Sequence, residues 1–176
     1  MDNDPLRDAL GAPVATLAAG IYDPNVDVRR GVIDALEALG PAAAPVAHAL
    51  VRALTDPDRF VRWAAARTLG KIGSVEAESA VPALERLLGD ADVDVRLAAA
   101  VALEHYGSAA RPAVPALIKA LGTPEVELRI AAIRALRAIG PDAKPAFPAL
   151  NTLLTDHDPR VRQLAAEAVD KLRVKN

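Results

Sequence analysis

The chain has 176 residues and a formal net charge of −2, and 52% of its residues are hydrophobic but only 3% are aromatic. Its core must therefore consist mainly of Ala, Leu, Val and Ile, and because Ala and Leu are strong helix formers, the composition predicts an all-α protein. The sequence contains no cysteine, which excludes disulfides and cysteine-ligated metals. A charge so close to zero gives no overall attraction to nucleic acid or to anionic lipid.

The N-terminal residues 1–5 are acidic, and no apolar region typical of a signal peptide follows them. No uncharged apolar run approaches the roughly 20 residues that a membrane span needs. We therefore expect a cytoplasmic protein that does not associate with membranes.

One short motif recurs five times. It has an Asp or Thr, and six residues later an arginine that directly follows an aliphatic residue. Its arginines lie at positions 29, 62, 96, 129 and 162, so the spacings are 33, 34, 33 and 33 residues. A second phrase, Pro-Ala-Leu, keeps the same register at 82–84, 115–117 and 148–150. Two phrases in phase predict a single domain of five repeats. The predicted units cover approximately residues 5–40, 41–73, 74–107, 108–140 and 141–176.

Each unit is predicted to contain two helices joined by a short turn. Asp56 and Thr123 are expected to cap second helices, each followed by proline at the first helical position. In the fifth unit the proline lies two residues later, so Asp158 can replace Asp156 as the cap. Acidic residues two positions after these caps and at the matching place in the third unit suit the positive end of the helix dipole: Asp58, Asp92 and Glu125. The second helices are expected to end at glycines in a left-handed conformation: Gly40, Gly73, Gly107 and Gly140.

One set of residues carries a family resemblance. Pro82, Asp90 and Arg96, separated by eight and six residues, match the Pro, Asp and Arg positions of HEAT repeats. Over about residues 12–173 the chain resembles the HEAT repeat family. The residue pattern within each repeat is most similar to the bacterial HEAT-like repeats of the bilin-lyase type. The resemblance implies a right-handed α-α superhelix, a HEAT-like solenoid of five two-helix repeats.

The resemblance also implies a structural ladder of ion pairs between adjacent units. Its members would be Asp23, Arg29, Asp56, Arg62, Asp90, Arg96, Arg129, Asp156 and Arg162. Thr123 is expected to interrupt this ladder in the fourth unit. Exposed pairs contribute only about 0.2–1 kcal/mol each, so stacking of apolar faces between units must supply most of the stability.

In solenoids of this kind the second helices line the concave side, which places a groove there. At about 100° per residue, Val61 and Leu69 share the buried stripe of their helix, whereas Phe60 and Trp63 lie on the opposite face. The corresponding columns of the other units complete the expected partner-binding surface. Its members are Phe60, Trp63, Arg67, Lys71, Leu97, Val101, His105, Ile130 and Arg134.

Phe60 and Trp63 are the main functional signal. Exposed apolar surface with a charged rim usually marks an interaction site, and Trp is enriched at binding hot spots. The alternative is that superhelical curvature packs both rings against a neighbouring second helix. By alignment with core columns, Tyr106 and Phe147 are expected in the core. We predict that Trp63→Ala weakens partner binding while barely lowering the melting temperature.

The sequence offers little catalytic chemistry. His105 is the one plausible acid–base residue, and a lone groove histidine is far more often a binding or solvated residue. The sequence has no Gly-rich phosphate loop, nucleophile elbow or metal-ligand cluster. We therefore expect a non-catalytic scaffold without metal or cofactor that binds a protein or peptide partner in its concave groove.

Three other functions remain open. The resemblance suggests a bilin-lyase-like chromophore chaperone or lyase, and the regular repeat suggests an engineered repeat binder, although one spacing of 34 residues and Gly31 inside a helix argue against design. Nucleic-acid binding is the third, but acidic residues interrupt the basic track that it would need. That track would consist of Arg30, Arg67, Lys71, Arg134, Arg160 and Lys171.

Overall fold

The computed structural model describes residues 14–73 and 75–173, so the expected start of the first unit lies outside the described residues. Every regular element within these ranges is a helix. Five long helices are the second helices of the five units. They are α2 (Val26–Leu39), α4 (Arg59–Ile72), α6 (Val93–Tyr106), α8 (Val126–Ile139) and α10 (Pro159–Arg173).

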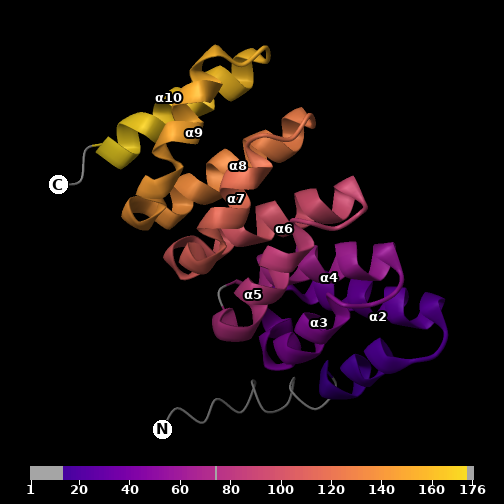
Figure 1. Cartoon of the computed structure of the whole chain (residues 1–176). Helices are drawn as coiled ribbons and strands as arrows, with labels where there is room; N and C mark the ends of the chain where they lie inside the picture. Colours follow the sequence, from indigo (N-terminus) through magenta and orange to yellow (C-terminus); the bar gives the residue numbers. More distant parts are fainter. Residues whose placement is uncertain (1–13, 74, 174–176) are drawn as a thin grey trace, which may run out of the picture.

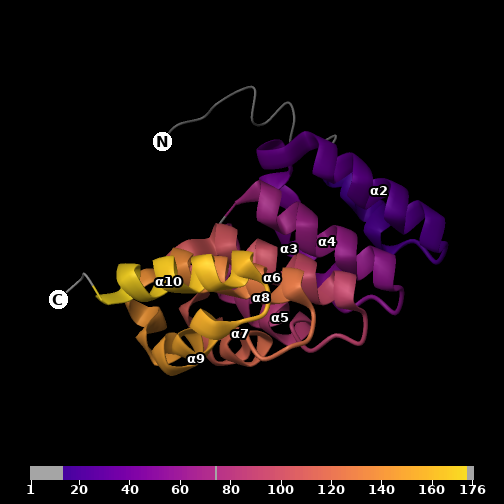
Figure 2. The same ribbon diagram turned by 90° about the horizontal axis from the view of Figure 1, so that it is seen from above.

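The second helices stack side by side in chain order, each in contact with the one before and the one after it (Figure 1). Shorter first helices form the other layer, which Figure 2 shows from above. These are α3 (Ala47–Ala53), α5 (Ala77–Leu87), α7 (Val114–Ala120) and α9 (Phe147–Thr152). The predicted all-α solenoid is therefore confirmed.

Most first helices are broken into a 3-10 segment and an α-helical segment. The 3-10 segments η2 (Gly40–Val46), η3 (Gly107–Ala113) and η4 (Gly140–Ala146) lead into α3, α7 and α9, and each contains an internal proline. Proline lacks the N–H that a continuous α-helix needs, which favours a break at these positions, although α5 contains Pro82 without one. Short 3-10 turns also occur as η1 (Ala19–Tyr22) and η5 (Leu153–Thr155).

The third unit differs, because its first helix α5 is the longest of the four and begins after a turn at Glu76. Glu76 has a φ of 54° and is the one non-glycine residue with positive φ in the described ranges. The extra residue of the 34-residue spacing falls in this unit.

The glycines that end the second helices all have positive φ, as predicted. The φ and ψ angles are 53° and −130° at Gly40, 99° and −165° at Gly73, 54° and −131° at Gly107, and 79° and −138° at Gly140. These ψ values lie outside the left-handed helical region, in backbone space that is accessible almost only to glycine. The chain reversal at each unit therefore depends on glycine more strictly than expected.

Two of the predicted N-caps, Asp56 and Thr123, are wrong by two residues, whereas Asp158 directly precedes α10 as predicted. Asp58 caps α4 and accepts a hydrogen bond from the backbone N–H of Val61 at 3.0 Å. Asp56 instead accepts from the backbone N–H of Asp58 at 2.9 Å, which closes an Asx turn ahead of the helix. In the fourth unit the N-cap is Glu125 and not Thr123, and its side chain makes no capping hydrogen bond.

Alanine and leucine fill the interface between successive second helices. One column of fully buried alanines allows the helices to approach closely: Ala65, Ala99, Ala132 and Ala165. A neighbouring column is Leu36, Leu69, Leu103 and Leu136, also with no exposed surface. Tyr106 lies in the core as predicted, and its hydroxyl donates to the carbonyl of Val75 at 3.2 Å. Burial raises the pKa of Tyr106 to about 12.

Candidate binding surface on the second helices

An arginine ladder ties each unit to the next along one edge of the second helices. Arg29 donates to the carboxylate of Asp56 at 2.8 and 3.0 Å, and Arg62 donates to Asp90 at the same two distances. Arg129 donates to Asp156 at 3.0 Å. These side chains are between 9% and 16% exposed, so the pairs are better shielded than the exposed pairs that we expected.

Each ladder arginine also fixes the turn before its own helix. Nη1 of Arg62, for example, donates to the carbonyls of Asp56 and Pro57 at 2.9 and 3.0 Å. The same nitrogen of Arg129 donates to the carbonyls of Thr123 and Pro124, both at 2.9 Å. One guanidinium therefore satisfies two turn carbonyls and a carboxylate of the next unit.

The expected interruption at Thr123 does not occur, because the N-cap residue of the fourth unit supplies the missing carboxylate. Arg96 donates to Oε1 of Glu125 at 2.8 Å. The hydrogen bonding around this ion pair is less complete than in the other units. Oε2 of Glu125 and Nε of Arg129 are buried without a hydrogen-bond partner in the described part of the chain.

The ladder ends with the first and last units. Asp23 accepts from the backbone N–H of Asn25 at 2.8 Å, and its carboxylate makes no hydrogen bond or ion pair with an arginine of the described ranges. Arg162 donates to the carbonyls of Asp156 and His157 at 2.7 and 3.0 Å, and it pairs with no carboxylate among the described residues.

The ladder predicts loss of stability in acid. Burial opposes ionisation of Asp90, but hydrogen bonds from Arg62 and from the backbone of Asp92 outweigh burial and lower the pKa of Asp90. A carboxyl with a lowered pKa in the folded state stabilises the protein above its unfolded pKa of about 3.9, and this stability is lost as the pH falls through the folded pKa. We expect Asp90→Asn to lower the melting temperature clearly at neutral pH and much less near pH 2. Thermal unfolding of the wild type and of Asp90→Asn across this pH range measures the difference in melting temperature. A difference that does not depend on pH would show that the Asp90–Arg62 ion pair is not its cause.

On the exposed face of the second helices, Phe60 and Trp63 lie one turn apart on α4. Phe60 is 46% exposed, and its ring lies beneath the guanidinium groups of Arg30 and Arg59, at 4.7 and 4.5 Å from the ring centroid. Trp63 is half-buried, and the Arg67 guanidinium lies 4.3 Å from its ring centroid. The two rings are therefore neither fully packed between helices nor isolated on the surface.

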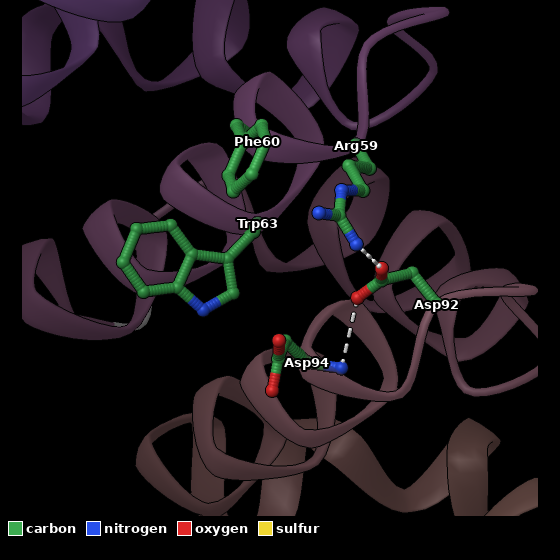
Figure 3. Close-up of a pocket in the computed structure, with 5 residues that line it drawn as sticks. All are labelled: Arg59, Phe60, Trp63, Asp92 and Asp94. Carbon is green, nitrogen blue, oxygen red and sulfur yellow. Dashed lines mark hydrogen bonds and ion pairs between the residues drawn. The ribbon is translucent and has the colours of Figure 1, made fainter.

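Two depressions flank this aromatic pair, and Phe60 and Trp63 line both. The first, of about 290 Å³, is completed by Arg59, Asp92 and Asp94, as Figure 3 shows. The second, of about 210 Å³, lies toward the first unit. Its other lining residues are Arg30, Asp34 and Ala64. We call these two depressions and the rings between them the aromatic surface.

Carboxylates of neighbouring units hold the cations around the aromatic surface. Arg30 pairs with Asp58 and Arg59 pairs with Asp92, both at 2.6 Å. The hydrogen bond from Arg59 is the main cause of the lowered pKa of Asp92. Glu37 of the first unit pairs with two cations of the second unit, Arg67 at 2.7 Å and Lys71 at 2.6 Å.

The remaining residues of the expected groove separate into exposed and covered ones. Val101 is 40% exposed, His105 and Arg134 are exposed, and Leu97 is half-buried. Ile130 is only 6% exposed, so its predicted place in the groove is wrong. The helical wheel treats one helix alone, whereas α8 lies between α6 and α10, whose side chains cover this column.

Sequence reasoning left Arg59 and Glu37 out of the site. A signal for Arg59 is present, because the same column holds Val26, Val93, Val126 and Pro159 in the other units, so the arginine is specific to the second unit. Glu37 gives no comparable signal, since its role depends on which cations of the next unit reach it.

Two further properties concern only the described residues. They contain no group of three or more His, Cys, Asp or Glu side chains placed to hold a metal ion. None of their helices combines the length and the apolar character needed to cross a membrane.

The fold and the ladder define a helical-repeat solenoid protein, and comparison with known families is consistent with this class. The chain belongs to the HEAT repeat family, whose model matches residues 14–104 and 114–175. The model of the PBS lyase HEAT-like repeat also matches, at residues 95–123. No curated protein matches the sequence.

Several solved structures share the fold. An engineered protein is 27% identical with a TM-score of 0.79, and the match covers 94% of this chain and 83% of that one. The complex of CpcE and CpcF of phycocyanin lyase from Nostoc sp. PCC7120 is 31% identical with a TM-score of 0.73, over 92% of this chain and 65% of that one. A designed armadillo repeat protein in complex with the peptide (KR)4 is 19% identical with a TM-score of 0.79, over 90% and 81% of the two chains.

Proposed function

We propose that this protein is a non-catalytic scaffold that binds an extended peptide segment of a protein partner on the aromatic surface. The observation that carries the proposal is the position of Phe60, a large apolar side chain that is 46% exposed between two depressions. Large aromatic side chains in such positions commonly act as binding anchors. The carboxylate partners of Arg30, Arg59 and Arg67 hold the surrounding cations in place before a ligand arrives, which reduces the entropy lost on binding.

The geometry of a solenoid supports a peptide ligand. Successive units repeat at about 8–10 Å, so an extended chain at about 3.3 Å per residue advances by roughly three residues per unit. Alternate side chains of such a segment can enter the two depressions while its backbone crosses the rings. The designed armadillo repeat protein with the same fold holds the peptide (KR)4, which shows that a solenoid of this shape accommodates a peptide.

The single tryptophan of the chain provides a direct test, because Trp63 emission reports on its own surroundings. Peptides selected from a random display library on the wild-type protein are expected to change this emission. Phe60→Ala is expected to weaken their binding at least tenfold, since loss of a central anchor typically costs more than 1 kcal/mol. Titration followed by Trp63 fluorescence measures both effects, because the fluorophore is retained in the variant.

Tyr22→Ala is the matched control, because Tyr22 is also an exposed aromatic residue beside an arginine but lies away from the aromatic surface. It should leave peptide affinity unchanged. Trp63→Ala, assayed with labelled peptides, should abolish most binding. Because the ring is half-buried, we expect this variant also to lower the melting temperature by a few degrees, more than the sequence alone predicted. If the peptides bind to the Phe60→Ala and Trp63→Ala proteins as tightly as to the wild type, the aromatic surface is not the binding site.

Bilin binding is the second candidate, favoured by the match to the PBS lyase HEAT-like repeat and by the 31% identity with the phycocyanin lyase complex. The match covers 65% of that chain, so the activity of the complete lyase does not transfer directly. A free bilin mixed with the protein distinguishes the two. A coloured complex that Phe60→Ala removes would favour bilin binding over peptide binding.

We further propose that nucleic acid is not the partner. Arg30, Arg67 and Lys71 would belong to any basic track on this face, and each already pairs with a carboxylate. Phosphate binding requires cations that are free to replace counterions. A salt-dependent mobility shift with DNA or RNA would contradict this.

A further inference from the structure

We propose that the segment bound by the aromatic surface is basic, with one Arg or Lys side chain entering the depression beside Asp94 and a second entering the depression beside Asp34. This inference rests on the proposed function, because it specifies the chemistry of the ligand at the same site.

The distribution of paired and unpaired charges carries the argument. The four cations of the surface all have carboxylate partners at 2.6 or 2.7 Å. In contrast, the carboxylates of Asp34 and Asp94, one in each depression, have no ion pair and no hydrogen bond within the described residues. Both residues are exposed, so their charge is available to a ligand.

The balance of formal charge points in the same direction. Three carboxylates and two cations line the two depressions, which leaves an excess of negative charge. The carboxylates are those of Asp34, Asp92 and Asp94, and the cations are Arg30 and Arg59. A cationic ligand therefore gains from the field of the surface, whereas an acidic ligand must displace a carboxylate from an arginine that already holds it.

The walls of the depressions also suit long basic side chains. Lys and Arg carry aliphatic stems that pack on apolar surface while the charged end remains near solvent. Phe60 and Trp63 line both depressions and offer that surface, and the unpaired carboxylate lies beside them in each case. The indole N–H of Trp63 has no acceptor in the described ranges. In Figure 3 it lies on the side of the ring nearest Asp94, where a peptide carbonyl can accept from it.

Three labelled peptides of about ten residues, long enough at about 3.3 Å per residue to cross three units, test the inference. One alternates arginine and glycine, one replaces arginine by citrulline, and one replaces it by glutamate. We expect the arginine peptide to bind at least tenfold more tightly than the other two, and increasing salt to weaken its binding. Asp94→Asn and Asp34→Asn keep the shape of the side chains, and each is expected to weaken binding about fivefold.

Asp170→Asn is the matched control, because Asp170 is an exposed carboxylate on α10, away from both depressions, and it should not change the affinity. Tight binding of the citrulline or glutamate peptide that still requires Phe60 would overturn the basic ligand but leave the proposed peptide-binding function intact. The same holds if Asp94→Asn and Asp34→Asn bind the arginine peptide as the wild type does. If none of the three peptides binds, the basic ligand is overturned and the library-selected peptides alone decide the proposed function. If neither these peptides nor the library-selected ones depend on Phe60 for binding, both proposals fail.

Discussion

Replacement of Arg62 by alanine is expected to lower the free energy of unfolding by about 2–3 kcal/mol. The substitution leaves the carboxylate of Asp90, only 9% exposed, without its bidentate partner. It also removes the donor to the carbonyls of Asp56 and Pro57. Because the pair is partly shielded from solvent, the loss should exceed that of an exposed ion pair but remain below that of a fully buried one. Urea denaturation followed by circular dichroism measures it.

Arg86→Ala provides the comparison for Arg62→Ala. Arg86 lies exposed on α5 and has no ion pair with a described residue, so its removal should change stability by less than about 0.5 kcal/mol. Arg62→Lys should recover only part of the loss, because an ammonium group cannot reproduce the planar contact with a carboxylate and two carbonyls. Equal stabilities for Arg62→Ala and Arg86→Ala would show that apolar stacking alone joins the second and third units.

Leu103→Ala is expected to cost about 3–4 kcal/mol, the largest effect of any substitution discussed. Leu103 is completely buried in the central unit, where α6 contacts both α4 and α8. Removal of its side chain leaves a cavity between layers of small residues, and alanine columns on either side cannot expand to fill it. A weakened central unit also reduces the coupling between the two halves of the array, so the urea transition should broaden.

Leu39→Ala separates this cavity effect from the general effect of losing a leucine. Leu39 lies on α2 and is 41% exposed, so the same change of side chain should cost less than about 1 kcal/mol. Urea transitions of equal midpoint for the two variants would contradict the assignment of the central unit as the core of the array.

Much of the fold could be predicted from the sequence because the repeat fixes its register. The five arginines and the terminal glycines mark the same structural position in every unit, and composition alone specifies helices with a small-residue core. The turn before each second helix was harder to predict. When two acidic residues lie two positions apart, either can cap the helix or close an Asx turn, and the sequence pattern alone does not distinguish the two.

The candidate site could be predicted only in part, because its residues depend on contacts between units. Phe60 and Trp63 stand out as aromatic residues in columns that lack them elsewhere. The burial of Ile130 and the replacement of Thr123 by Glu125 in the ladder depend on how far side chains of one unit reach into the next. A pattern within one helix contains no information on that reach.

Within the layer of second helices, each helix packs against the one before and the one after it, and this has a consequence for the aromatic surface. In an array of this kind, local opening of one unit acts directly only on the units next to it. Phe60 and Trp63 lie on α4, with an ordered helix on either side. Local opening of α10, which α6 and α8 separate from α4, is therefore expected to leave the aromatic surface assembled.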